Sequence, residues 1–151
     1  MKNKLLVFLI LFATICNAQM LLKKSDGTVI TNGSIHTYIG LTEPTNYMGI
    51  KVYNTSTNPI NVKAQMASMT NSDGTQTQLC LGTSCVGDLV AGPLGYPSDQ
   101  FVIAGNGQNG NYDHFLNGNP GINTAQNVEY VLRFYMLDAN NVEIGNAISF
   151  T

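Results

Sequence analysis

Apolar and polar residues alternate along most of the chain from residue 20 onward, with the period of two that is typical of half-buried β-strands. The clearest case is INVKAQM at residues 60–66, where every second side chain is apolar. The segments that we predict as strands are residues 20–22, 28–31, 34–39, 47–54, 60–66, 77–81, 100–104, 128–137 and 142–150, with residues 112–116 as a further short candidate. Clusters of Gly, Asn, Asp, Ser and Pro separate them and predict turns.

Two hairpins stand out in this pattern. Asn32-Gly33 is the dipeptide most typical of a tight turn and predicts that residues 28–31 pair with residues 34–39. The longest hairpin joins residues 128–137 to residues 142–150. Both faces of its first strand carry apolar side chains, which indicates a strand covered on both sides or lying at an interface. Residues 86–97 contain too much Gly and Pro for regular structure.

These elements predict an all-β protein, because no helical period appears outside the first 18 residues. Short strands at roughly 10-residue spacing favour an antiparallel β-sandwich of the immunoglobulin or fibronectin type III kind, with about 7–9 strands. A jelly roll is the alternative. The sequence contains no Trp, so the usual immunoglobulin core Trp is missing and the likeness would be one of architecture.

The first 18 residues have the composition of a secretory signal peptide. Lys2 and Lys4 are followed by an apolar run at residues 5–15, which is too short to span a bilayer as a helix. Cys16-Asn17-Ala18 then provides small side chains for signal peptidase, which predicts cleavage between Ala18 and Gln19. We therefore expect residues 19–151 to form a single domain outside the cytoplasm, whether periplasmic, on the cell surface or extracellular.

Two other fates of this segment are weaker. A lipoprotein would be acylated at Cys16, but Ile15 precedes that cysteine where the lipoprotein peptidase needs a small residue. An uncleaved anchor is disfavoured by the short apolar run and by the polar Asn17. No stable membrane insertion is expected after cleavage, and the oligomeric state stays open.

Charge argues against nucleic acid as a partner. Removing the first 18 of 151 residues leaves 133 residues with five Lys and Arg against nine Asp and Glu, a formal charge near −4. Non-specific affinity for nucleic acid depends on clustered Lys and Arg, and the few basic residues here are scattered. Polarity comes instead from Asn, Thr, Ser, Gln and Gly, which is common in extracellular β proteins.

Cys80 and Cys85 are the cysteines that remain after cleavage. In an oxidising compartment this spacing predicts one local disulfide. A metal site would need further Cys or His ligands nearby, and the sequence has none within thirty residues on either side. A disulfide that closes so small a loop stabilises the fold by only about 2 kcal/mol, so it shapes a loop or bulge more than it holds the whole fold together.

The chain from residue 20 to 151 resembles the small secreted Ig-like domains of Bacteroidota that often precede a type IX secretion sorting domain. The features that carry the resemblance are the Asp26-Gly27 turn, the segment VYNTSTNPINVK, the Cys80-x-Gly82-x-x-Cys85 motif and the C-terminal YVLRFYMLDANN. Leu81 departs from members that carry an aromatic residue after the first cysteine. No sorting domain follows Thr151, so the domain is either a complete periplasmic or released protein or a piece of a longer one. The resemblance implies a non-catalytic accessory or surface role and supplies no catalytic residues.

The segment with the most site-like composition is GNGQNGNYDHFLNGN at residues 105–119. Its amides and aromatic rings are the groups that bind sugars, although long loops of β-sandwiches share this composition. The candidate ligand residues are Asn106, Gln108, Asn109, Tyr112, Asp113, His114 and Phe115. For His36 and His114 we expect surface or hydrogen-bonding roles, since adjacent residues such as Asp113 and His114 point to opposite faces of a strand.

Other chemistry has weaker support. Asp138 and Asn140 offer oxygen ligands for calcium, but the segment lacks the Gly and terminal Glu of an EF-hand, and a plain hairpin turn explains both residues. No nucleophile, zinc-protease or phosphate-binding motif is present, so no catalytic residue and no cofactor are expected. The function predicted first is a non-catalytic interaction or structural domain whose partner is a protein or a surface polysaccharide. A carbohydrate-binding module is the alternative, and a small secreted hydrolase is less favoured.

Overall fold

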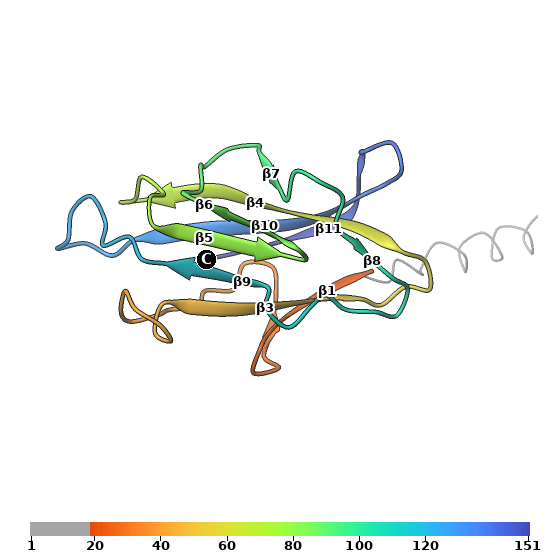
Figure 1. Cartoon of the computed structure of the whole chain (residues 1–151), viewed down its shortest axis with the longest axis horizontal. Helices are drawn as coiled ribbons and strands as arrows, with labels where there is room; N and C mark the ends of the chain where they lie inside the picture. The colour runs from red at the N-terminus through yellow and green to blue at the C-terminus, as the bar shows by residue number, and fades with distance from the viewer. Residues whose placement is uncertain (1–18) are drawn as a thin grey trace, which may run out of the picture.

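The computed structural model describes residues 19–151, so the predicted signal peptide and the Ala18 side of its cleavage site lie outside the described residues. Two antiparallel sheets pack face to face and form a β-sandwich (Figure 1). The strands are β1 Met20–Lys24, β2 Val29–Ile30, β3 Tyr47–Asn54, β4 Ile60–Thr70, β5 Thr77–Leu81, β6 Ser84–Gly87, β7 Gly95–Tyr96, β8 Val102–Ile103, β9 His114–Asn117, β10 Glu129–Leu137 and β11 Glu143–Phe150. The predicted all-β sandwich is confirmed.

The order of the strands is that of an immunoglobulin constant-type domain. One sheet runs β2-β1-β3-β9-β5-β6, and the other runs β11-β10-β4-β7, with β8 also paired to β4. Apart from the short additions, this is the ABED and GFC arrangement, with β1, β3, β4, β5, β9, β10 and β11 as strands A to G. The topology therefore decides for the Ig-like sandwich over the jelly roll.

The core lies between the sheets and is built from alternate residues of the long strands. On β10 the inward side chains are Tyr130, Leu132, Phe134 and Met136, all at most 9% exposed. They face apolar side chains of β3 and β9 in the other sheet. The outward face of β10 is half-buried, in line with its predicted second apolar face.

Residues 34–39 correct one prediction, because they form no strand of their own. Their first part pairs with the end of β11: the amides of Gly33 and His36 donate to the carbonyls of Ser149 and Thr151, and Thr151 donates back to Ser34. One residue that bonds to two residues spaced two apart is the pattern of parallel strands. The Asn32-Gly33 hairpin therefore does not form, because the chain leaves one sheet at β2 and crosses to the edge of the other.

The segment at residues 86–97 is mostly irregular, as predicted, but it starts in β6 and includes the two-residue β7. It covers Lys63 of β4, which is only 8% exposed. The Lys63 ammonium donates to the carbonyls of Pro97, Ser98 and Asp99, at 3.1 Å to Ser98 and 2.7 Å to Asp99. Those carbonyls satisfy a buried cation that the sequence pattern would have placed on the surface.

Candidate functional site

The predicted disulfide is present and links two paired strands. Cys80 of β5 and Cys85 of β6 are directly opposite each other, with their Cα atoms 4.0 Å apart. Between them the chain turns at Gly82, whose φ of 64° lies in the left-handed region. A side chain at Gly82 would also meet the Phe101 ring, since an added Cβ would lie 2.7 Å from it. The bridge thus locks a tight hairpin at the edge of the six-stranded sheet.

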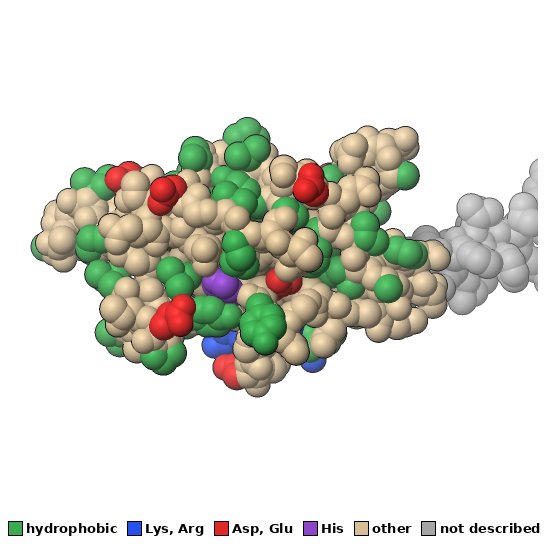
Figure 2. Space-filling view, in the orientation of Figure 1, with side chains coloured by type: hydrophobic (Ala, Val, Ile, Leu, Met, Phe, Trp, Pro, Cys, Tyr) green, Lys and Arg blue, Asp and Glu red, His purple; other side chains and the backbone are tan. Residues whose placement is uncertain are grey.

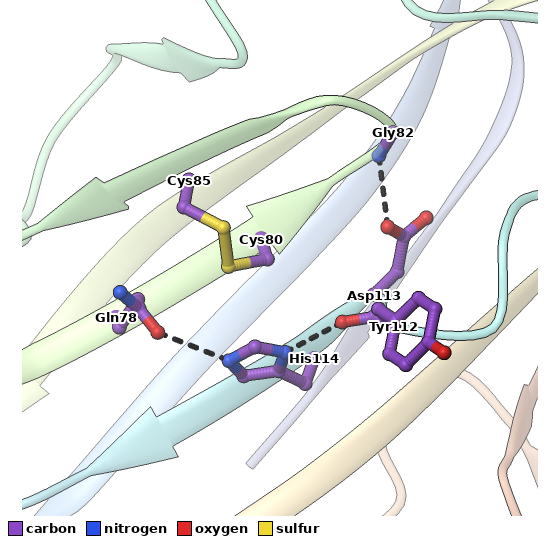
Figure 3. Close-up of a disulfide and its surroundings, with 7 residues drawn as sticks. All are labelled: Gln78, Cys80, Gly82, Cys85, Tyr112, Asp113 and His114. Carbon is purple, nitrogen blue, oxygen red and sulfur yellow. Dashed lines mark hydrogen bonds between the residues drawn. A yellow bond between two sulfur atoms is a disulfide. The ribbon is translucent and has the colours of Figure 1, made fainter.

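Asp113 ties the predicted ligand loop to this hairpin. Its side chain is buried, and its Oδ1 accepts the Gly82 amide at 2.9 Å while Oδ2 accepts Asn109 Nδ2 at 2.6 Å. Figure 3 shows the carboxylate directed at the turn between the cysteines. Burial raises the pKa of Asp113, although these two hydrogen bonds oppose the shift. The carboxylate therefore has a structural role in this loop.

Asn109 also belongs to the fold. It is 6% exposed, accepts the Val52 amide with Oδ1 at 2.8 Å and donates to the Ile50 carbonyl at 3.0 Å. Its side-chain amide thus substitutes for a neighbouring strand along β3. Asn106 and Gln108 are exposed, and Asn106 occupies a turn with a φ of 55°.

The two aromatic residues of the loop do not form a joint platform. Phe115 is 8% exposed and packs edge-on against Tyr130 in the core, with 5.2 Å between the ring centroids. Tyr112 is 85% exposed and lies outside the core. The prediction that both rings face one ligand is wrong, because β9 starts at His114 and its alternation turns Phe115 inward.

His114 is the residue of this loop that lies on the outer face of the sheet. Its Nδ1 is 2.6 Å from the Tyr112 carbonyl and its Nε2 is 3.1 Å from Gln78 Oε1 (Figure 3). The Tyr47 ring stacks on it with 4.6 Å between centroids. Both ring nitrogens are thus engaged, in line with the hydrogen-bonding role predicted for this histidine.

Further outward side chains of β3 extend this arrangement. Tyr53 lies under the ammonium of Lys23, which is 5.0 Å from the ring centroid. Lys51 donates to the Gly110 carbonyl at 3.1 Å and to the Asn111 side chain. We call the outward rings of Tyr47, Tyr53, Tyr112 and His114 the aromatic face. Charged side chains are few and scattered on the side of the molecule shown in Figure 2.

Sequence reasoning missed Tyr47 and Tyr53. The alternation in residues 47–54 does assign them to the face opposite Met48, Ile50 and Val52. It does not show that β3 pairs with β9, the register that brings Tyr47 next to His114. Only the topology joins residues that are far apart in the chain.

Asp138 and Asn140 serve as turn residues. Asp138 Oδ1 accepts the amides of Asn140 and Val142, each at 2.8 Å, and this closes the hairpin between β10 and β11. Within residues 19–151 no group of three or more His, Cys, Asp and Glu side chains is placed to hold a metal ion. The same part of the chain contains no helix with the length and apolar character needed to span a bilayer.

Comparison with known proteins adds little. No protein-family model matches the sequence, and no curated protein matches it. Among solved structures the chain is similar to the N-terminal domain of PorA, with 17% sequence identity and a TM-score of 0.45. The match covers 87% of this chain and 96% of that one. At this level of similarity it says nothing about what this chain binds.

Proposed function

We propose that the protein is a non-catalytic binding domain that works outside the cytoplasm and engages a surface polysaccharide through the aromatic face. The single observation that carries this proposal is the set of outward rings on one regular sheet, Tyr47, Tyr53, Tyr112 and His114, with Lys51 and Gln78 beside them. Sugar rings pack their C–H groups on aromatic faces, while amides and ammonium groups bind the hydroxyls.

A non-catalytic role is supported by how the candidate acid–base groups are used. Asp113 is committed to the turn at Gly82 and to Asn109. His114 is committed to Tyr112 and Gln78, and His36 contacts Ser34 and the edge of the Phe150 ring. Groups that are fixed by structural hydrogen bonds in this way are poorly placed to exchange protons with a substrate.

A location outside the cytoplasm is supported by two features. The first is the predicted signal peptide at residues 1–18. The second is the disulfide between Cys80 and Cys85, because disulfides persist in oxidising compartments and are rare in the cytosol. The resemblance to secreted Ig-like domains of Bacteroidota points the same way.

The test is polysaccharide binding by matched variants. We expect the protein to be retained by at least one polysaccharide of a cell-surface panel, and Tyr112→Ala combined with Tyr53→Ala to weaken retention about tenfold or more. Tyr135→Ala is the matched control: this ring lies on the other sheet and also contacts a cation, with Arg133 4.8 Å from its centroid. Retention by no polysaccharide, or equal losses in both variants, would contradict the proposal.

A protein partner is the second candidate for this face, because exposed Tyr side chains are also typical of protein interfaces. Cross-linking in the cell envelope from a photoreactive residue at position 112 distinguishes the two. Attachment to one defined protein, together with no polysaccharide retention, would favour it.

A further inference from the structure

A groove opens at the end of the sandwich, away from the residues of the aromatic face. It has a volume of about 540 Å³, which lies within the roughly 300–1,000 Å³ of small-molecule sites. Its floor consists of side chains from both sheets: Met48, Phe115, Tyr130, Leu132 and Phe150. Residues 35–41, the segment that was predicted as a strand and forms none, line its other side. The groove therefore reaches from solvent to the apolar interior.

Asn46 lines this groove and carries an unsatisfied acceptor. The residue is 7% exposed, and its Oδ1 is buried without any hydrogen-bond partner. Nearly all buried polar atoms in folded proteins are paired, because an unpaired one keeps its full desolvation cost. The neighbouring backbone is fixed, since the Asn46 carbonyl accepts the Asn117 amide at 3.0 Å. Rotation of the terminal amide about its soft χ2 torsion turns Oδ1 toward a molecule in the groove.

The charge of the lining restricts the ligand further. Glu129 is the one carboxylate or ammonium among the lining residues, and it is exposed. His36 is the other titratable base there, and burial lowers its pKa, so it is neutral at neutral pH. An anionic ligand would meet no counter-charge and would be repelled by Glu129.

We propose that this groove binds a small neutral amphiphile, with its apolar body on the floor of the groove and a hydroxyl or amide N–H donated to Asn46 Oδ1. Long-chain alcohols and acyl esters with a free hydroxyl are ligands of this class. The site is independent of the aromatic face, so it goes beyond the polysaccharide role proposed above.

The first experiment uses N-phenyl-1-naphthylamine, a neutral fluorescent probe with one N–H donor, on the exported form of the protein. We expect saturable fluorescence enhancement and displacement by 1-dodecanol below its aggregation concentration. Dodecanoate at neutral pH has the same chain with a charged end, and we expect it to compete about tenfold less well or worse. No saturable enhancement, or equal competition by alcohol and carboxylate, overturns the proposal.

The second experiment removes the acceptor. Asn46→Leu has a similar shape without the polar group, and we expect it to bind 1-dodecanol about three- to tenfold more weakly, as the loss of one hydrogen bond predicts. Asn140→Leu in the β10–β11 turn is the matched control and should bind as the unmodified protein does. An unchanged affinity in Asn46→Leu contradicts the proposed contact.

If Asn46→Leu fails to fold, the NMR signal of the Met48 methyl group in the unmodified protein replaces it. That signal should shift on adding 1-dodecanol and stay in place on adding dodecanoate, and a shift elsewhere only contradicts the site. Tyr112→Ala combined with Tyr53→Ala should leave alcohol binding unchanged. Failure of the polysaccharide proposal is therefore visible separately from failure of this one.

Discussion

At the scale of single residues, asparagine side chains do much of the work that backbone groups do elsewhere in a sandwich. Asn54 is 2% exposed and donates to the carbonyls of Asn58, Ile103 and Ala104, while its oxygen accepts from Ser56. Asn109 does the same for Ile50 and Val52. The many Asn residues that suggested a sugar-binding surface are therefore partly internal supports for irregular loops.

Replacing Asn54 tests this role. Asn54→Ala leaves carbonyls and a backbone amide without partners in a mostly buried place, so we expect the free energy of unfolding to fall by about 2–4 kcal/mol. Urea denaturation of the disulfide-intact protein measures it. Asn140→Ala, whose side chain is exposed in a turn, should stay within about 0.5 kcal/mol of the unmodified protein. Similar small losses in both variants would show that the Asn54 network contributes little.

At the scale of elements, the disulfide hairpin is the feature with the clearest energetic consequence. Cys80 and Cys85 close a short loop between strands that already pair through backbone hydrogen bonds. The edge position of β6 means that the bridge holds β6 to β5 and supports the Gly82 turn, which receives Asp113.

Removing the bridge should have a modest effect on the whole fold and a larger local one. For the double variant Cys80→Ser, Cys85→Ser we expect the free energy of unfolding to fall by about 2 kcal/mol, because the unfolded chain gains the entropy of a small loop. Hydrogen exchange should accelerate most at the Gly82 amide, whose acceptor is Asp113. Equal acceleration throughout β10 would indicate instead that the bridge supports the entire core.

Regular strands could be predicted from the sequence, whereas elements that depend on distant partners could not. The predicted bounds of β3 and β5 agree with the structure, and those of β10 and β11 differ by one residue at the start. Residues 34–39 have a strand-like pattern, but their hydrogen bonds go to the end of β11 and their apolar residues line a groove. In the site, the fate of Phe115 was set by where β9 begins, a boundary that alternation alone does not fix.

At the scale of the whole molecule, the predictions concern export. The signal-peptide pattern predicts that the working chain begins at Gln19, one residue before β1 at Met20. Intact-mass measurement of the exported protein should show the loss of residues 1–18, and a mass two units below that of the reduced chain because of the disulfide. A lipid-modified Cys16 or an uncleaved chain would contradict this assignment.

The parallel contact between residues 33–36 and the end of β11 also has a mechanical consequence. It joins a segment near one end of the chain to the last residues at the other, through bonds at Gly33, Ser34 and His36. Because the two segments run in the same direction, a force that pulls the two ends of the chain apart loads these bonds in shear, all together. Strands that are peeled apart lose their bonds one at a time. A domain fastened in this way resists stretching along its own chain, and its lifetime under tension is governed by the unfolding rate rather than by its equilibrium stability.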